Sequence, residues 1–339
     1  MNQPLARRLG RALLQLPLDL LRSLLLLSAF VSLVLSLLAN GGRFSRLLDV
    51  IAHFALGGFV VSLLALAASL AIWPRGGRKP AALALAGLLA WGLLIAPDYV
   101  RAALAPRSPA GGEMIKIVQF NLWVDNVDPV GTANWILKED ADVVVVEEIS
   151  DIPGRIIARL KGVYPYQIGC RDPYPCSTMI LTKTAPIQTG GWPIPFGRAN
   201  LAWVKLTGPG GDYVIAGVHH AWPYPVGIQP DQVPWTASTL KAFDQHNLIL
   251  SGDFNSTPWT RALKDQDRLI GLERRTRALP TWPAYVFERR PTRFPMPLLP
   301  IDHIYAGDAW KTVSVRRGPR LGSDHYPIVI TLRRDTPAH

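Results

Sequence analysis

Apolar residues are distributed unevenly along the chain. Three stretches without a charged residue come first, at Ser23–Ala39, Phe54–Trp73 and Ala81–Ala96. A helix that crosses a membrane needs about 20 apolar residues. The second stretch has this length, the first is slightly shorter, and the third reaches it only with its flanking residues. We predict three membrane-spanning helices, with a helix in the membrane interface or in a protein core as the alternative for the third.

From residue 113 onward the apolar residues occur in short runs. A helical pattern at Asp128–Glu139 follows the first run, and Pro129 stands where the first turn of a helix accepts proline. Nearly continuous apolar strands indicate sheets that are buried on one or both faces. The pattern therefore predicts an α/β domain, with strand-like runs at Met114–Phe120, Asp142–Glu147, Thr178–Leu181, Ala202–Leu206, Tyr213–Val218, Leu248–Ser251, Ile301–Tyr305 and Ile328–Leu332.

These patterns divide the chain into four segments. Residues 1–105 form the predicted membrane domain, and residues 106–112 (PRSPAGG) have the composition of a linker. Residues 113–334 form the predicted α/β domain, and residues 335–339 form a short tail. The length of the α/β segment suffices for one compact domain with its own core.

The positive charge is concentrated around the apolar stretches. Of the net charge of +11, residues 1–112 contribute +8 (11 Lys and Arg against 3 Asp and Glu), and residues 113–339 contribute +3 (25 against 22). Positive residues in short loops stay cytoplasmic, and here seven lie on one side of the spans and four on the other. This predicts a cell-membrane protein with its α/β domain outside the cytoplasm. A cleaved signal peptide over residues 1–39 is the alternative, although no Ala-x-Ala site closes it.

The chain has two cysteines, Cys170 and Cys176, in the segment GCRDPYPC. Their separation around two prolines permits a disulfide, which an extracytoplasmic compartment would allow. Two free thiols are the equally weighted alternative. The spacing fits no common zinc site.

Polar side chains follow several of the predicted strands. Asn121 follows the first run, and Glu147 and Glu148 end the second, where a strand would point them to opposite faces. Oxygen-rich ligands without thiols suit a hard cation such as Mg²⁺ or Mn²⁺. Single Asn or Asp residues at strand ends are common in turns, so the evidence is the ordered set. The other members are His219, His220, Asp253, Asn255, Asp302, Asp324 and His325.

This ordered set resembles the endonuclease/exonuclease/phosphatase superfamily over about residues 115–332. The segments that carry the resemblance are KIVQFNL, DVVVVEEI, GVHH, SGDFNSTP, IDHI and GSDHYPI. The resemblance implies a four-layered αββα sandwich of two mixed, mostly antiparallel sheets. It also implies a phosphoester hydrolase that uses Mg²⁺ or Mn²⁺.

The resemblance assigns roles to residues of this sequence. Asn121, Glu148 and Asp324 are the implied metal site. Asp253 is implied to orient or deprotonate the attacking water, and Asn255 to bind phosphate. The remaining implied catalytic residues are a cationic His325, with its pKa raised by Asp302, and His219 as a phosphate donor or leaving-group acid.

Three departures from the family pattern stand out. Glu147 occupies a position where the family often has Gln. Trp123 stands where some members have a second metal-binding Asp, which favours one metal ion. His220 replaces a usual apolar residue, either as a substrate contact or as an exposed spare imidazole.

Three functions compete at this point. The first is a membrane-anchored hydrolase of lipid-linked phosphates or pyrophosphates, for which Trp192, Trp222, Tyr224 and Trp235 are candidate contacts with the lipid interface. The second is an extracytoplasmic nuclease or other phosphodiesterase. Its polyanionic substrate would be held by Arg274, Arg275, Arg277, Arg289, Arg290 and Arg293. The +3 balance of the domain makes nucleic acid the less favoured partner. The third is a non-catalytic binding module, which the intact set of acidic and His residues opposes.

Overall fold

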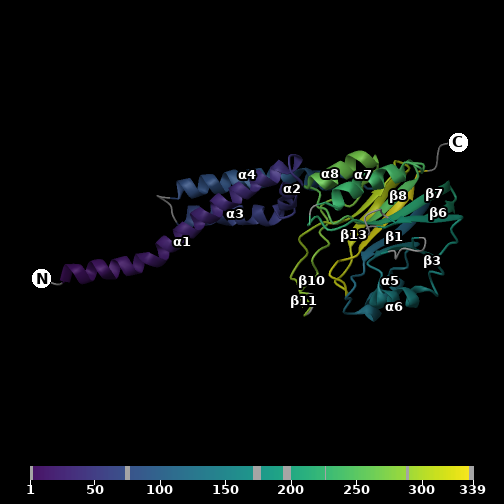
Figure 1. The fold of residues 1–339 in the computed structure, drawn as a ribbon, viewed down its shortest axis with the longest axis horizontal. Helices are drawn as coiled ribbons and strands as arrows, with labels where there is room; N and C mark the ends of the chain where they lie inside the picture. Colours follow the sequence, from purple (N-terminus) through teal and green to yellow (C-terminus); the bar gives the residue numbers. More distant parts are fainter. Residues whose placement is uncertain are drawn as a thin grey trace. The chain divides into compact units, whose positions relative to one another are not determined.

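The computed structural model describes residues 3–72, 77–170, 177–193, 200–225, 227–287 and 290–335 (Figure 1). Contacts divide the chain into two units, Met1–Pro97 and Asp98–His339. The first unit is helical and the second contains the strands.

Long apolar helices make up the first unit. Helices α1 (Gln3–Asn40), α3 (Ala55–Ile72) and α4 (Arg78–Leu104) are joined by the short η1 (Gly41–Arg43) and α2 (Arg46–Ala52) and by residues 73–77. Three segments are long and apolar enough to cross a membrane: Leu16–Arg43, Ala55–Ile72 and Arg78–Leu104. The third predicted span, marginal by its uncharged length, thus lies in a helix of 27 residues. The chain is accordingly associated with a membrane.

Small polar residues hold the first unit's helices together. The Trp91 indole donates to Ser32 at 3.1 Å, and the Ser32 and Ser62 hydroxyls lie 2.8 Å apart. A Cβ atom on Gly58 would lie 2.2 Å from the Trp91 ring, so glycine permits this close packing. Small residues and hydroxyl groups commonly mediate such helix contacts in membranes.

Two six-stranded sheets form the centre of the second unit (Figure 1). The first sheet has the order β13 (Trp310–Arg317), β14 (Ile328–Arg334), β1 (Glu113–Asn121), β2 (Val143–Glu147), β4 (Thr178–Thr182), β3 (Tyr166–Ile168). The second has the order β5 (Gln188–Pro193), β6 (Asn200–Gly208), β7 (Gly211–His219), β8 (Leu248–Asp253), β12 (Asp302–Ala306), β9 (Glu273–Arg274). The eight predicted runs correspond to β1, β2, β4, β6, β7, β8, β12 and β14, because alternate buried positions on these runs fill the space between the sheets. Strands β3, β5, β9 and β13 were not predicted. A small hairpin pairs β10 (Tyr285–Val286) with β11 (Thr292–Arg293).

Helices cover the outer faces of the two sheets. Helices α5 (Pro129–Glu139) and α6 (Asp151–Leu160) pack on the first sheet, and α7 (Gln229–Leu240) and α8 (Arg261–Ile270) pack on the second. A third cluster of buried residues fills the space between the sheets. The Asp128 side chain caps α5 by accepting from the backbone of Gly131, and Pro129 lies in its first turn, as predicted. The predicted four-layered αββα sandwich is confirmed.

The sheet topology brings separate polar segments to one rim. Strands β1 and β2 are parallel, and so are β7 and β8, so the ends of each pair lie side by side. Strand β12 runs antiparallel to β8, which places its first residue, Asp302, opposite Asp253. Strand β14 runs antiparallel to β1, so the segment before it also meets this rim. Residues that are more than 200 positions apart in sequence can therefore contact one another.

Candidate active site

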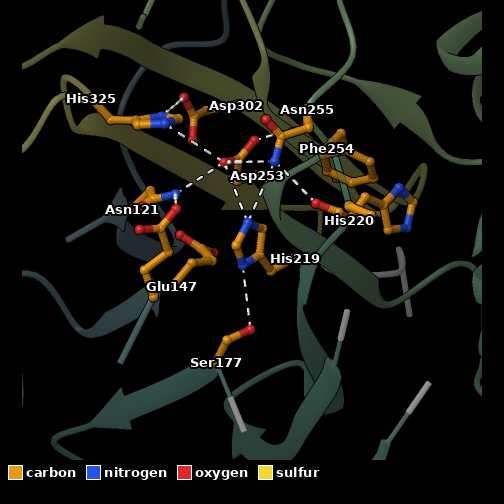
Figure 2. A network of polar contacts seen from close by, with 12 residues as sticks. Asn121, Glu147, Ser177, His219, His220, Asp253, Phe254, Asn255, Asp302 and His325 are labelled. Atoms are coloured by element: carbon orange, nitrogen blue, oxygen red, sulfur yellow. Dashed lines mark hydrogen bonds and ion pairs between the residues drawn. The ribbon is translucent and has the colours of Figure 1, made fainter. Parts of the chain in front are cut away.

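Asp253 lies at the centre of the polar cluster on this rim (Figure 2). Its Oδ2 atom accepts hydrogen bonds from the Asn121 amide at 3.0 Å and the Asn255 amide at 3.3 Å. The Nε2 atoms of His219 and His325 lie 3.7 Å from the same oxygen. Burial raises the pKa of Asp253 to about 8. The structure thus gathers four predicted residues around one carboxyl group that holds a proton near neutral pH.

His325 and Asp302 form a buried ion pair beside Asp253. The Nδ1 atom of His325 donates to Asp302 Oδ2 at 2.8 Å, and the Thr281 hydroxyl donates to the same oxygen. Burial opposes charge on His325, but the carboxylates of Asp302 and Asp253 raise its pKa well above the usual range. Burial likewise opposes ionisation of Asp302, but His325 lowers the pKa of that carboxyl group. The imidazole is therefore a cation that keeps its Nε2–H available for a ligand.

Glu148 faces the rim because the backbone turns sharply after β2. Its φ angle of 60° lies in the left-handed region, which is uncommon outside glycine and frequent at functional sites. Its carboxylate accepts from the Asn121 amide at 2.9 Å and from the Val124 backbone at 3.2 Å. Asn121 thereby links Glu148 to Asp253, and its own Oδ1 accepts from the Trp123 backbone.

Glu147 also belongs to this network, contrary to the expectation that only one of the two glutamates faces the site. It is fully buried between the sheets and accepts from the Gln119 amide at 3.0 Å. Burial, together with Asp302 and Asp253, raises the pKa of Glu147 well above its usual range. The expectation fails because the strand ends at Glu147 and the left-handed Glu148 no longer continues its alternation.

Asp324 presents a buried oxygen without a partner. The Trp282 indole donates to its Oδ2 at 3.1 Å, whereas Oδ1 has no hydrogen-bond partner among the described residues. Burial raises the pKa of Asp324 to about 6, a value in which His325 acts to lower the pKa and the nearby Glu148 carboxylate acts to raise it. Two acidic groups that repel one another, one with an unsatisfied oxygen, form a suitable environment for a cation.

The two adjacent histidines have different surroundings. His219 ends β7, its Nδ1 lies 3.3 Å from the Ser177 hydroxyl, and burial lowers its pKa. His220 is not the exposed imidazole that was one of the two alternatives, and its role as a substrate contact stays a prediction. It is 1% exposed, bonds the Thr236 hydroxyl at 2.9 Å and packs edge-on against Phe254, and burial lowers its pKa to about 3.

The cluster can hold a metal ion. Ligand atoms of Asp253, Asp302 and His325 lie within 4.8 Å of one another. Asp302 and His325 already bond each other, however, so a cation there would have to displace that hydrogen bond. Glu148 and the free Asp324 oxygen offer a second location of oxygen atoms alone, the type of ligand that Mg²⁺ prefers.

The arginines predicted to hold a polyanion divide into two groups. Arg274 is 3% exposed and bonds Asp267 and the Thr276 carbonyl, and Arg275 bonds Glu273 and backbone carbonyls, so both stabilise the fold. Arg277 is also mostly buried, with 14% of its side chain exposed. Arg290 and Arg293 are exposed near the β10–β11 hairpin, and Arg289 lies outside the described residues. A continuous basic groove built from all six is therefore wrong.

The aromatic residues predicted to contact the lipid interface differ in their exposure to solvent. Trp222 is 56% exposed and Tyr224 is 66% exposed, whereas Trp235 packs against the core of the second sheet. The side chain of Trp192 lies outside the described residues. Trp222 packs edge-on against Trp282, at 6.1 Å between ring centres, and Trp282 bonds Asp324. An exposed aromatic side chain thus stands next to the polar cluster.

Cys170 is part of a disulfide. Cys176 lies outside the described residues, so its pairing with Cys170 remains a prediction.

Comparison with known proteins identifies the family to which this chain belongs. The model of the Endonuclease/Exonuclease/phosphatase family matches residues 118–325, which is more than half of the chain. The chain therefore belongs to this family of phosphoester hydrolases, as its motifs indicated. No curated protein matches it.

Solved structures agree on the fold at low sequence identity. An endonuclease/exonuclease/phosphatase from Beutenbergia cavernae is 20% identical with a TM-score of 0.53, over 67% of this chain and 74% of that chain. TDP2 from D. rerio, complexed with a single-strand DNA product, is 15% identical with a TM-score of 0.52, over 66% and 100%. Beta toxin from Staphylococcus aureus is 14% identical with a TM-score of 0.51, over 64% and 99%. The similarity covers the sandwich and shows a shared fold.

Four side chains of the site were not predicted from the sequence: Gln119, Ser177, Thr281 and Trp282. Only Gln119 could have been recognised from the sequence. It lies on the same face of its strand as Ile115 and Ile117, which belong to the core. A polar residue in such a series costs free energy unless it is bonded, which points to a specific partner. The other three lie in loops, where no local pattern indicates their direction.

Proposed function

We propose that this chain is a membrane-anchored, Mg²⁺-dependent hydrolase of lipid-linked phosphate or pyrophosphate esters, with its catalytic unit outside the cytoplasm. The arrangement that carries the hydrolytic assignment is the carboxyl group of Asp253, flanked by the His325–Asp302 ion pair and two amide donors. Such a set pairs a proton acceptor with donors for a phosphoryl group.

The donor atoms suit Mg²⁺ at Glu148 and Asp324. Both groups are carboxylates, the charge of Glu148 contributes to raising the pKa of Asp324, and one Asp324 oxygen has no partner in the described part of the chain. In this proposal Asn121 orients Glu148, since its Oδ1 accepts from Trp123, and it is no longer needed as a direct metal ligand. When bound, the cation withdraws charge from the phosphoryl oxygens and so lowers the barrier to attack.

The remaining residues act on the water and the phosphate. Asp253 acts after it has lost its own proton, which a pKa of about 8 permits for a fraction of the molecules at neutral pH. The carboxylate then accepts a proton from the attacking water, whose oxygen forms the new bond to phosphorus as the bond to the leaving oxygen breaks. Cationic His325 donates its Nε2–H to a phosphoryl oxygen, and Asn255 donates its amide to the same group. His219 stays neutral because burial lowers its pKa, so we assign it a hydrogen-bonding role on the phosphate and not that of a leaving-group acid.

Two observations favour a lipid-linked substrate. The same chain carries three candidate membrane spans. The exposed Trp222 packs on Trp282, which bonds the Asp324 carboxylate, so an apolar surface begins beside the polar cluster. Indole rings favour the boundary between apolar and polar surroundings.

An extracytoplasmic nuclease is the second candidate. Exposed Arg290 and Arg293 near the β10–β11 hairpin favour it, and a fold neighbour from D. rerio was solved with a single-strand DNA product. Against it, Arg274 and Arg275 bond groups of the fold itself, which leaves few cations for a long strand.

The test offers three substrates to the full-length protein in detergent with Mg²⁺: undecaprenyl diphosphate, a phospholipid and plasmid DNA. We expect phosphate release from the lipid diphosphate to be fastest. Preferential cleavage of DNA would instead establish the nuclease, and turnover of none of the three would contradict the hydrolase assignment.

Active-site variants connect that activity to the assigned residues. Glu148→Gln and His325→Ala should each lower kcat by on the order of 10²–10⁴-fold, because each group stabilises charge in the transition state. Glu148→Gln should also raise the Mg²⁺ concentration that gives half-maximal activity, whereas His325→Ala should not. The matched controls are Glu273→Gln and His246→Ala, since both residues are exposed and form ion pairs outside the site. Full activity of both active-site variants would show that the site lies elsewhere.

A further inference from the structure

Gln119 connects the two sheets directly beneath the catalytic rim. It lies on β1 of the first sheet, and its Nε2 atom donates to Asp302 Oδ1 at 2.9 Å on β12 of the second. The same nitrogen donates to Glu147 Oε2 at 3.0 Å on β2. All three side chains are at most 1% exposed.

The surroundings make this contact unusual for its position. Ile115 and Ile117, on the same face of β1, belong to the apolar cluster that fills the space between the sheets. An apolar residue at position 119 would continue this packing without having to satisfy a polar group. A buried amide costs free energy unless its hydrogen bonds are made, and one atom of Gln119, Oε1, has no partner among the described residues. Its placement is therefore poorly explained by stability alone.

The two oxygens of Asp302 have different partners. Oδ2 accepts from His325 Nδ1 and from the Thr281 hydroxyl, whereas Oδ1 accepts from the Gln119 amide. A carboxylate held at one oxygen can rotate about its Cβ–Cγ bond, but one held at both oxygens cannot. The Gln119 bond thus fixes the plane of Asp302 and, through Oδ2, the direction of the His325 ring.

We propose that Gln119 is a positioning residue for catalysis: anchored by Glu147, it holds Asp302 in the orientation that aims His325 Nε2 at the phosphoryl group. Glu147 takes part as the second attachment of the Gln119 amide. This inference rests on the proposed role of His325 in phosphoester hydrolysis.

The main variant is Gln119→Met, which keeps the length of the side chain and removes the donor. We expect kcat to fall by roughly 10- to 100-fold with KM nearly unchanged, because a catalytic group displaced by about 1 Å costs a factor of this size. Glu147→Gln retains an acceptor for the Gln119 amide and should keep most of the activity, whereas Glu147→Met should lose part of it.

A matched control is Gln266→Met. Gln266 is a fully buried glutamine on α8 whose side-chain atoms have no partner among the described residues, and it lies outside the network. The same exchange at that position should leave kcat unchanged, whatever it does to the melting temperature. Melting curves of all variants identify any that fail to fold.

A second readout does not depend on turnover. In full-length protein with ¹⁵N-labelled histidine, the Nδ1–H proton of His325 bonded to Asp302 should give a strongly downfield proton resonance, assigned by its loss in His325→Ala. We expect Gln119→Met to shift or broaden this resonance and Gln266→Met to leave it in place.

The outcomes separate this inference from the proposed function. Unchanged kcat and an unchanged His325 resonance in folded Gln119→Met would show that Gln119 only stabilises the core, even if His325→Ala is inactive. Full activity of His325→Ala would instead contradict the proposed function itself.

Discussion

At Asp253, burial and neighbouring acidic groups oppose ionisation, whereas His325 and two amide donors favour it. The result is a pKa of about 8, close to the pH at which a group can both accept and release a proton. For the neighbouring pair, the pKa of His325 is raised and that of Asp302 is lowered, so both groups are charged. Neighbouring titratable groups whose pKa values are pushed apart are typical of acid–base sites.

This environment predicts a pH-dependent stability difference in Asp253→Asn. An unfolded aspartate loses its proton near pH 3.8, but the folded one keeps it to about pH 8. Between these values the folded state binds a proton that the unfolded state does not, so this group's contribution to stability falls as pH rises. In chelator, the melting temperature of Asp253→Asn relative to wild type should therefore increase between pH 4.5 and 8.

Asp212→Asn provides the control for that measurement. Hydrogen bonding to Lys205 lowers the pKa of Asp212 below its usual value, so its contribution is complete above about pH 4 and is lost only on further acidification. The difference between Asp212→Asn and wild type should be flat over the same range. A flat profile for Asp253→Asn as well would contradict the assigned environment of Asp253.

At the scale of elements, the pairing of β7 with β8 sets the spacing of His219 and Asp253. These residues are partners in the parallel register, and Gly252 pairs with Val218 one step before them. A Cβ atom on Gly252 would lie 1.8 Å from the Val218 carbonyl oxygen, which is backbone and cannot move aside. The absence of a side chain at position 252 therefore permits the approach of the two strands.

Gly252→Ala should accordingly weaken both the fold and the site. We expect the free energy of unfolding to fall by about 1–3 kcal/mol or more, the usual cost of forcing atoms into a packed core. The strands must separate, so kcat should also fall, by about 10- to 100-fold. Chemical denaturation and steady-state kinetics measure the two effects.

Gly154→Ala is the matched substitution in the same unit. It lies on α6, and an added Cβ atom would meet nothing within 4 Å. Alanine should stabilise this helix by about 0.5–1 kcal/mol and leave kcat unchanged. A Gly252→Ala protein as stable and active as wild type would refute the close-approach argument.

For the molecule as a whole, the membrane unit carries most of the net positive charge. Residues 1–112 hold +8 of the +11, and seven of their eleven positive residues lie before Ser23 or between Trp73 and Ala81. These positions are the N-terminal part of α1 and the region that joins α3 to α4. The positive-inside rule predicts that both belong in the cytoplasm, in which case three crossings place the catalytic unit outside.

Fusions with reporter proteins test this orientation. A C-terminal alkaline phosphatase fusion should be active, because that enzyme folds only outside the cytoplasm, and a C-terminal green fluorescent fusion should be dark. The control is a fusion that ends at Gly77, between the second and third spans, for which the two reporters should reverse. An active phosphatase at Gly77 together with an inactive one at the C-terminus would invert the proposed topology.

Much of the fold and the membership of the site were predictable from sequence. Strands and helices follow from the spacing of apolar residues over a few positions, so β1, β2 and α5 were found almost to the residue. Strands β3, β5, β9 and β13 of the two sheets were not predicted; in β13 the exposed positions alternate with few strongly apolar ones. Asp253, Asn255, Asp302 and His325 were assigned to the site by the motifs that carry the family resemblance, and the structure brings these four residues together.

Only the tertiary structure decided how these residues act on one another. The direction of Glu148 depends on one left-handed residue, and the burial of His220 depends on its contacts with Thr236 and Phe254. The bond from Gln119 to Asp302 joins two sheets and 183 positions. A local pattern of polar and apolar residues predicts that a segment is a helix or a strand. It does not predict which other segment packs against it, so contacts of this kind depend on the tertiary structure.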